Sequence, residues 1–173
     1  MDFNLTEEQI MIRDAARDFA KSELLPGVIE RDETQTFPAE AVKKMGELGF
    51  LGMMVDPKYG GGGMDTVSYV LAMEEISKID ASASVIMSVN NSLVCWGLEN
   101  FGTEAQKQKY LVPAITGEKV GGLAVSEPGA GSDVANIKTR AERQGDHYII
   151  NGSKTFITNG VYGDYVTVSC KTD

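Results

Sequence analysis

The sequence has few of the residues that build metal centres and nucleophilic active sites. Among its 173 residues there is one histidine, His147, and there are two cysteines, Cys95 and Cys170. A four-ligand zinc site cannot be completed from these three residues without carboxylates, and the sequence contains no CxxC pair. A Ser-His-Asp triad would depend on His147 alone, which we interpret instead as a half-exposed strand residue. We therefore predict no metal site and two free thiols in a reducing compartment.

Basic residues and long apolar runs are also scarce. The chain has 16 Lys and Arg against 25 Asp and Glu, a net charge of −9. Nucleic acids and anionic membrane surfaces attract basic faces, so we expect neither as a partner. No stretch approaches the ~20 apolar residues of a membrane span. The opening residues, MDFNLTEEQ, lack the basic start of a signal peptide, and we expect a cytoplasmic protein.

What the sequence does contain is typical of a globular protein, with 42% hydrophobic residues, and its first two-thirds have helical patterns. Thr6–Gln9 and Thr103–Gln106 each match a capping box, the signature of a helix start. Pro26 is expected to kink or end the first helix, and Pro38 to open another that ends at Gly49.

The buried faces of the middle helices are predicted from apolar spacing. After a loop containing four glycines, Asp65 is expected to cap a helix whose inward residues are Val67, Val70, Leu71 and Ile76. The charge-poor stretch Ala81–Leu98 indicates one buried helix. Adjacent Glu74 and Glu75 are expected on the solvated surface, and the methionines Met53, Met54, Met73 and Met87 in the core.

The pattern changes from helix to strand at Gly117. Short apolar segments separated by turn signals at Gly145-Asp146 and Asn151-Gly152 predict about four strands, which we interpret as a β-meander. The predicted fold class is α+β, with a helical domain over residues 1–116 and the start of an antiparallel β-domain over residues 117–173. A sheet of this size leaves an open edge that folded proteins normally cover.

The loop Val125–Asp133 is the strongest candidate for a binding site. It carries glycines and the hydroxyls of Ser126 and Ser132 at the end of a strand, and such dipoles suit a neutral or anionic ligand. A capped Pro-Gly turn explains the same residues equally well. A dinucleotide fingerprint is excluded because its third glycine position holds Val134 and no βαβ unit surrounds it. Gly152–Thr155 lacks the residue order of a P-loop.

Two strings carry a resemblance to a known family. They are residues 123–133, LAVSEPGAGSD, and residues 151–160, NGSKTFITNG. Shorter strings at residues 59–63, 101–107 and 113–117 support them. The sequence resembles the acyl-CoA dehydrogenase family, near its short-chain and butyryl-CoA members, from the first helix to the last residue.

The resemblance implies a helical domain, a β-domain and a C-terminal helical bundle that this sequence does not contain. It also implies FAD as cofactor, held by seven residues: Leu123, Val125, Ser126, Ser132, Phe156, Ile157 and Thr158. Ser126 and Thr158 would contact the flavin through their hydroxyls, and Phe156 would pack on its ring. Ser132 is also carried over as a contact to the acyl-CoA. Phe156 replaces the tryptophan of many members, and Leu123 replaces the aromatic residue of some.

The implied reaction belongs to fatty acid metabolism: oxidation of an acyl-CoA thioester to trans-2-enoyl-CoA by α-proton abstraction and hydride transfer to FAD. An electron-transfer flavoprotein would be the redox partner, and the full-length parent would be a homotetramer. The family's catalytic glutamate lies in the C-terminal domain, so no catalytic residue is assigned here and the isolated fragment is expected to be inactive. The alternative is a non-catalytic binding or scaffold module without flavin. Acyl chain length and the choice between dehydrogenase and oxidase stay open.

Overall fold

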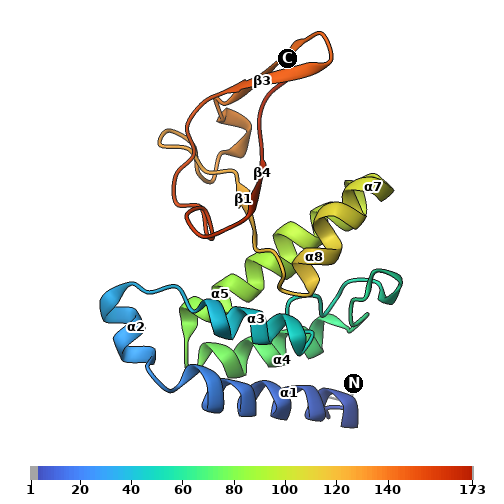
Figure 1. The fold of residues 1–173 in the computed structure, drawn as a ribbon, viewed down its shortest axis with the longest axis vertical. Coiled ribbons are helices and arrows are strands. Elements are labelled where there is room, and N and C mark those ends of the chain that lie inside the picture. The colour runs from blue at the N-terminus through green and yellow to red at the C-terminus, as the bar shows by residue number, and fades with distance from the viewer. Residues whose placement is uncertain (1–3, 173) are drawn as a thin grey trace. The chain divides into compact units, whose positions relative to one another are not determined.

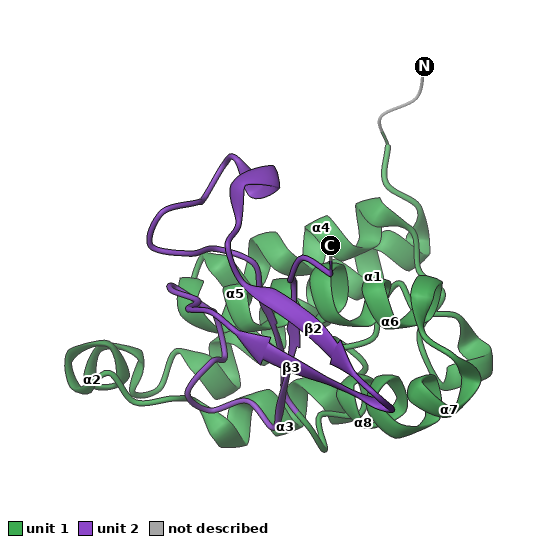
Figure 2. Cartoon of the chain, turned by 90° about the horizontal axis from the view of Figure 1, so that it is seen from above, with its two compact units in different colours: residues 1–119 green, residues 120–173 purple. Residues whose placement is uncertain are grey.

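The computed structural model describes residues 4–172, which form two compact units (Figures 1 and 2). The helical unit ends at Lys119 and the β unit begins at Val120, whereas the sequence pattern places the change of domain between residues 116 and 117. A helical region followed by a short β region confirms the predicted α+β class. Among the described residues, no helix has the length and apolar character needed to cross a membrane.

The helical unit contains eight α-helices within its described residues. They are α1 (Glu7–Phe19), α2 (Val28–Thr34), α3 (Ala39–Glu47), α4 (Thr66–Ser77), α5 (Ala81–Ser88), α6 (Trp96–Phe101), α7 (Glu104–Gln106) and α8 (Val112–Ile115). Helix α4 packs against both α1 and α5, and α3 packs on α5 (Figure 1). The core between them is apolar, and its largest fully buried side chains include Leu24, Met45, Leu51, Met53, Ile76, Met87 and Leu111.

Local hydrogen bonds set the helix boundaries as predicted. The Thr6 hydroxyl accepts from the Gln9 backbone while the Gln9 side chain accepts from the Thr6 backbone, and Thr103 and Gln106 repeat this arrangement. Helix α1 continues as a π-helical turn, Ala20–Leu24, that ends before Pro26. Gly49, just beyond α3, has a left-handed φ of +81°. Both capping boxes and the helix ends predicted at Pro26 and Gly49 are therefore confirmed.

The prediction of which α4 residues face inward is wrong for two of them. Val67 and Val70 are 49% and 52% exposed, whereas Tyr69, Ala72 and Ile76 are buried. Helix α4 carries apolar residues around most of its circumference, so spacing alone does not distinguish its buried face. The packing of α1 and α5 against it selects that face.

The stretch Ala81–Leu98 also differs from one buried α-helix. It consists of α5, a π-helical segment over Val89–Cys95 and the start of α6. The π segment buries Asn90 and Asn91, whose side-chain amides donate to the carbonyls of Leu51 and Phe50, both at 2.8 Å. Residues 50–55 form no regular helix or strand, so these two carbonyls lack the backbone partners that such an element would give them. The side-chain amides of Asn90 and Asn91 serve as their donors instead.

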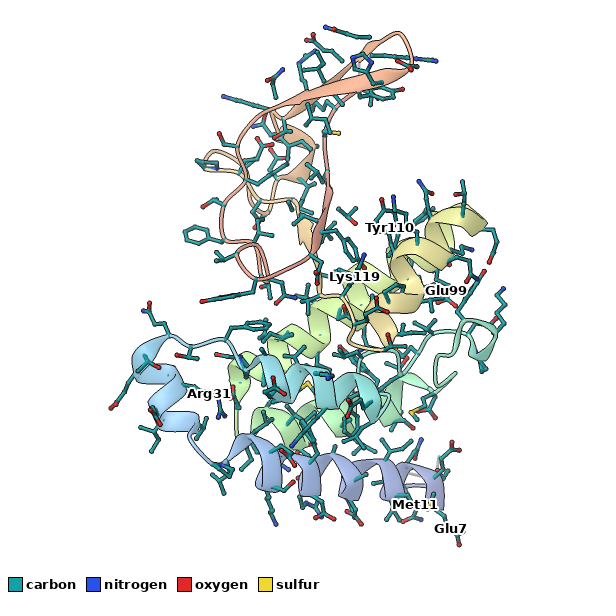
Figure 3. The ribbon with its side chains drawn as sticks, viewed as in Figure 1. Glu7, Met11, Arg31, Glu99, Tyr110 and Lys119 are labelled. Carbon is teal, nitrogen blue, oxygen red and sulfur yellow. The ribbon has the colours of Figure 1, made fainter. Side chains whose placement is uncertain are left out.

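Charged residues connect helices that are distant in sequence. Arg31 of α2 donates to Asp80, the N-cap of α5, at 3.1 Å, and Glu99 of α6 accepts from the Asp56 backbone at 2.9 Å; Figure 3 labels both side chains. Glu75 is buried, which corrects the expectation that it is solvated. Its carboxylate accepts from Arg17 at 2.9 and 3.0 Å and from Lys78 at 2.9 Å. These hydrogen bonds lower the pKa of Glu75 to about 2.

The β unit contains two separate strand pairs, so the predicted β-meander is wrong. Strands β2 (Arg140–Gln144) and β3 (His147–Asn151) form the expected antiparallel hairpin around Gly145-Asp146. Strand β1 (Gly121–Ala124) instead pairs in parallel with β4 (Tyr165–Val168), with Gly121 opposite Tyr165. Residues 154–158 follow the turn signal at Asn151-Gly152, but they belong to no strand and cross beside β1 without joining a ladder.

Candidate functional site

The loop that follows β1 is a tight turn, and its shape is set by its own backbone. The Glu127 N–H donates to the Ala130 carbonyl at 2.8 Å, and the Ala130 N–H donates back to Glu127 at 3.1 Å. Pro128 and Gly129 form the exposed tip between them. Pro has no N–H to satisfy and a fixed φ, so it suits the corner of such a turn. Ser126 lies half-buried immediately before it.

The Glu127 side chain turns inward and organises the interior of the β unit. Its carboxylate accepts from the Lys138 N–H at 2.6 Å, from both the N–H and the hydroxyl of Thr139, and from Lys154 Nζ at 2.9 Å. These donors hold the pKa of Glu127 well below its usual range. A carboxylate that accepts so many hydrogen bonds is a poor proton acceptor, so the role of Glu127 is to hold the surrounding backbone in place.

Lys154 brings the second resemblance string beside this loop. Its ammonium donates to the Val125 carbonyl and to the Glu127 carboxylate, each at 2.9 Å. The Thr155 N–H next to it donates to the Ser126 carbonyl at 3.0 Å. Through these bonds, residues almost 30 positions apart in the sequence lie side by side.

Asn159 makes a similar connection at the other end of the same stretch. It is buried, and its side-chain amide donates to the Gly121 carbonyl at 2.9 Å. Between the two connections the chain runs so close to β1 that a Cβ on Gly122 would lie 2.9 Å from the Thr158 carbonyl. Glycine is required at this point of β1 because any side chain would displace the crossing segment.

Phe156, midway along the stretch, combines an unusual backbone with an unusual environment. Its φ is +56°, in the left-handed region that costs a non-glycine residue about 1–2 kcal/mol. Its side chain is 96% exposed, so the ring gains no packing within the chain to offset that strain. Strain and a fully exposed aromatic ring at one residue point to a contact made with a ligand or with further polypeptide.

Six of the seven predicted cofactor residues therefore belong to one neighbourhood. Leu123, Val125 and Ser126 run along β1 into the loop, and Phe156, Ile157 and Thr158 form the segment that crosses beside it. Ser132 is on the exposed stretch that follows the Glu127–Ala130 turn, and the contacts above do not include it.

The residues that hold this neighbourhood together are absent from the predicted set. They are Glu127, Thr139, Lys154 and Asn159. Glu127, Lys154 and Asn159 lie within the two resemblance strings, so the sequence did offer a signal for these three. Thr139 had none, because nothing in its sequence context indicates a buried hydroxyl partner.

The donors and surfaces of this neighbourhood fit a planar, hydrogen-bonding heterocycle such as a flavin. Phe156 offers an exposed aromatic ring, and the half-buried residues Ser126 and Thr158 carry hydroxyls. Asn159 Oδ1 is buried without a hydrogen-bond partner, so this part of the segment has an acceptor that a ligand N–H or O–H could satisfy. Within residues 4–172, no group of three or more His, Cys, Asp or Glu side chains is placed to hold a metal ion.

Comparison with protein families identifies both units. Residues 6–118 match the acyl-CoA dehydrogenase N-terminal domain, and residues 122–173 match the acyl-CoA dehydrogenase middle domain. The chain belongs to the acyl-CoA dehydrogenase family.

Individual relatives match all or nearly all of this chain, which spans less than half of their own length. The short-chain specific acyl-CoA dehydrogenase of Clostridium acetobutylicum is 49% identical over 173 residues, which are 100% of this chain and 46% of that protein. A chain in a solved structure of the electron transferring flavoprotein of Acidaminococcus fermentans is 48% identical, with a TM-score of 0.96 over 100% of this chain and 46% of that one. Glutaryl-CoA dehydrogenase of Mycobacterium smegmatis, solved in complex with FADH2, is 37% identical with a TM-score of 0.94 over 98% of this chain and 44% of that one.

Proposed function

We propose that this chain is the N-terminal and middle part of an FAD-dependent acyl-CoA dehydrogenase that converts acyl-CoA thioesters to trans-2-enoyl-CoA. The observation that carries the proposal is the crossing of residues 154–159 beside β1 and its loop, where the Thr155 N–H donates to the Ser126 carbonyl and the Thr158 carbonyl lies against Gly122. Family membership supports it, as does the FADH2 complex of a relative with the same fold.

Each residue has a distinct part in binding. Ser126 and Thr158 supply hydroxyls that hydrogen-bond polar atoms at the flavin edge, and the Phe156 ring covers one face of the heterocycle and excludes water. Leu123, Val125 and Ile157 provide the apolar and backbone surface between them. Ser132, on the exposed stretch beyond the turn, contacts the acyl-CoA.

FAD, when bound, supplies the acceptor for the hydride that leaves the substrate β-carbon. The α-proton requires a separate base, and Glu127 cannot serve because its four hydrogen-bond donors occupy the carboxylate oxygens and lower their affinity for a proton. The base then belongs to polypeptide found in longer family members, and this chain alone is inactive toward acyl-CoA. An electron-transfer flavoprotein as redox partner, a homotetrameric parent and a cytoplasmic location complete the proposal.

Flavin binding is the direct test of this proposal. The purified chain is titrated with FAD, and quenching of flavin fluorescence gives the dissociation constant. We expect weak but saturable binding, and we expect Ser126→Ala and Thr158→Val each to raise the dissociation constant several-fold because each removes one hydrogen bond to the ring.

Thr167→Val is the matched control, since Thr167 is an exposed hydroxyl on β4 of the same unit. Its dissociation constant should equal that of the unaltered chain. Failure of the unaltered chain to bind FAD at any accessible concentration would favour the alternative of a binding or scaffold module. Equal affinity in all four proteins would remove Ser126 and Thr158 from the site.

A further inference from the structure

Residues 154–159, the crossing segment, are attached to β1 and its loop by side chains at both ends and by few contacts between. At the first end, the Lys154 side chain is 12% exposed, and its ammonium donates to the Val125 carbonyl and to the carboxylate of Glu127, a side chain that is 6% exposed. At the last end, the Asn159 amide bonds the Gly121 carbonyl. The Asn159 attachment is at Gly121, the first residue of β1, and the Lys154 attachment is at Val125 and Glu127, just beyond its end. Together they fix both the position and the direction of the segment.

The backbone between these attachments is unlike that of an ordinary surface loop. Phe156 and Asn159 both have left-handed φ values, +56° and +65°. Asparagine tolerates this conformation, but phenylalanine has no local hydrogen bond that favours it. A strained residue persists only where its surroundings determine its conformation more strongly than its own preference does.

Packing on the Phe156 ring does not hold the backbone in this conformation, because the side chain is almost fully exposed. The Thr155 N–H, one residue earlier, is fixed to Ser126, and the Thr158 carbonyl, two residues later, lies against Gly122. The constraint on Phe156 therefore comes from the attachments on either side of it.

We propose that Lys154 and Asn159 are positioning residues, which hold the crossing segment in a strained conformation so that the Phe156 ring is presented in advance to the flavin. This inference rests on the proposed function for the identity of the ligand. Preorganisation of this kind raises affinity because the ordering of the segment is completed during folding and not during binding.

The first experiment measures the attachments without any ligand, by NMR of the 173-residue chain. In Lys154→Met we expect the protection of the Thr155 amide against hydrogen exchange to fall at least tenfold. In both Lys154→Met and Asn159→Gly, we expect the HN–Hα coupling and backbone shifts of Phe156 to move from left-handed values toward ordinary extended ones. Asn159→Gly keeps the left-handed backbone available and removes only the amide, so strain at position 159 does not confuse the result.

Two further variants separate the role of the Lys154 charge from general disruption. Lys154→Arg should restore Thr155 protection, because it keeps a cation within reach of the Glu127 carboxylate. Lys138→Met is the matched control: Lys138 is exposed and contacts Glu127 only through its backbone N–H, so losing its side chain should leave Thr155 and Phe156 unchanged.

The second experiment asks whether the attachments act through the Phe156 ring. Lys154→Met should raise the FAD dissociation constant about tenfold in the native sequence and at most about twofold in a Phe156→Ala background. This non-additivity is the signature of two residues that act as one unit. A merely structural lysine would weaken binding equally in both backgrounds.

The outcomes are separable. Unchanged Thr155 protection or an unchanged Phe156 φ in Lys154→Met would overturn the inference whether or not FAD binds. Additive losses of FAD affinity would overturn the action through Phe156. Absence of FAD binding in the unaltered chain would contradict the proposed function, and with it the flavin as the ligand of the ring, while the exchange and coupling data still decide the attachments.

Discussion

The two units of this chain differ in how many large apolar side chains their interiors contain. The helical unit is built around fully buried apolar side chains such as Leu24, Met45 and Ile76, with a smaller number of buried polar residues among them, including Glu75 and Asn90. The interior of the β unit has few large apolar residues, and its buried side chains include Glu127, Thr139 and Asn159.

This difference has a physical consequence. Burial of apolar area is non-directional and tolerates small displacements, whereas a hydrogen-bonded carboxylate requires each donor at a fixed distance and angle. A polar interior therefore gives less stability per residue but specifies the backbone around it more closely. The β unit, which carries the candidate flavin site, is the one that uses it.

The largest expected effect comes from removing apolar volume from the helical core. Ile76→Ala, at a fully buried position of α4, should lower the free energy of unfolding of the helical unit by about 2–5 kcal/mol, through lost transfer energy and a residual cavity. Urea unfolding followed by far-UV circular dichroism measures this loss.

Val67→Ala on the same helix is the control, because Val67 is half-exposed, and it should change stability by less than about 0.5 kcal/mol. A comparable loss in the two variants would contradict the assignment of the buried face of α4. Amide protection of Thr155 in the β unit should be the same in both variants if the two interiors are independent.

A smaller effect on the free energy of unfolding is expected at Glu75, the buried carboxylate of α4. Glu75→Gln removes charge-assisted hydrogen bonds to Arg17 and Lys78 and should cost about 2 kcal/mol near neutral pH. The folded-state pKa is lowered from 4.5 to about 2, so the stabilisation is complete above about 4.5 and is lost as the pH falls through about 2. Stability measured by urea titration between about pH 6 and pH 2 should fall in the native chain and fall less in Glu75→Gln.

Glu74→Gln is the matched variant, since Glu74 is the exposed neighbour of Glu75 and shares only a surface ion pair with Lys78. It should reproduce the native pH profile. A profile as flat as that of Glu75→Gln would show that surface charge, and not the buried carboxylate, governs acid stability in this unit.

The smallest effect on stability is expected in the β unit, where geometry matters more than energy. A Cβ at Gly122 would lie 2.9 Å from the Thr158 carbonyl, so Gly122→Ala should displace the crossing segment at a cost of about 1 kcal/mol. FAD affinity should fall more than this modest loss suggests, because Phe156–Thr158 move away from Ser126. Thermal unfolding and flavin titration on the same samples measure both quantities.

Gly129→Ala tests whether any added methyl in this region has the same result. Gly129 lies at the tip of the turn with nothing within 4 Å of the added Cβ, so stability and flavin affinity should be unchanged. Equal losses of affinity at Gly122 and Gly129 would contradict a specific contact between β1 and the crossing segment.

Helix starts and turns were predictable because their determinants lie within four residues of one another. Thr6 and Gln9 form the predicted capping box, and Gly145-Asp146 joins the predicted hairpin. The resemblance strings likewise identified six residues that the structure brings to one place.

Other features could not be predicted because their partners are distant in the sequence. Glu75 resembles its neighbour Glu74 until Arg17, 58 positions away, is placed against it. The same is true of Glu127. Its position beside a Pro-Gly turn suggests an exposed residue, and its burial follows only from the contacts with Thr139 and Lys154.

The sequence by itself determined where helices begin, where the chain turns, and that two glycine-containing strings belong together. Only the tertiary structure decided that β1 pairs with β4 in parallel, which carboxylates are buried, and that Phe156 is held in a strained and exposed conformation. The physical reason is that backbone capping and turn preferences act between near neighbours. Burial and ion pairing, in contrast, depend on which distant segments the folded chain brings into contact.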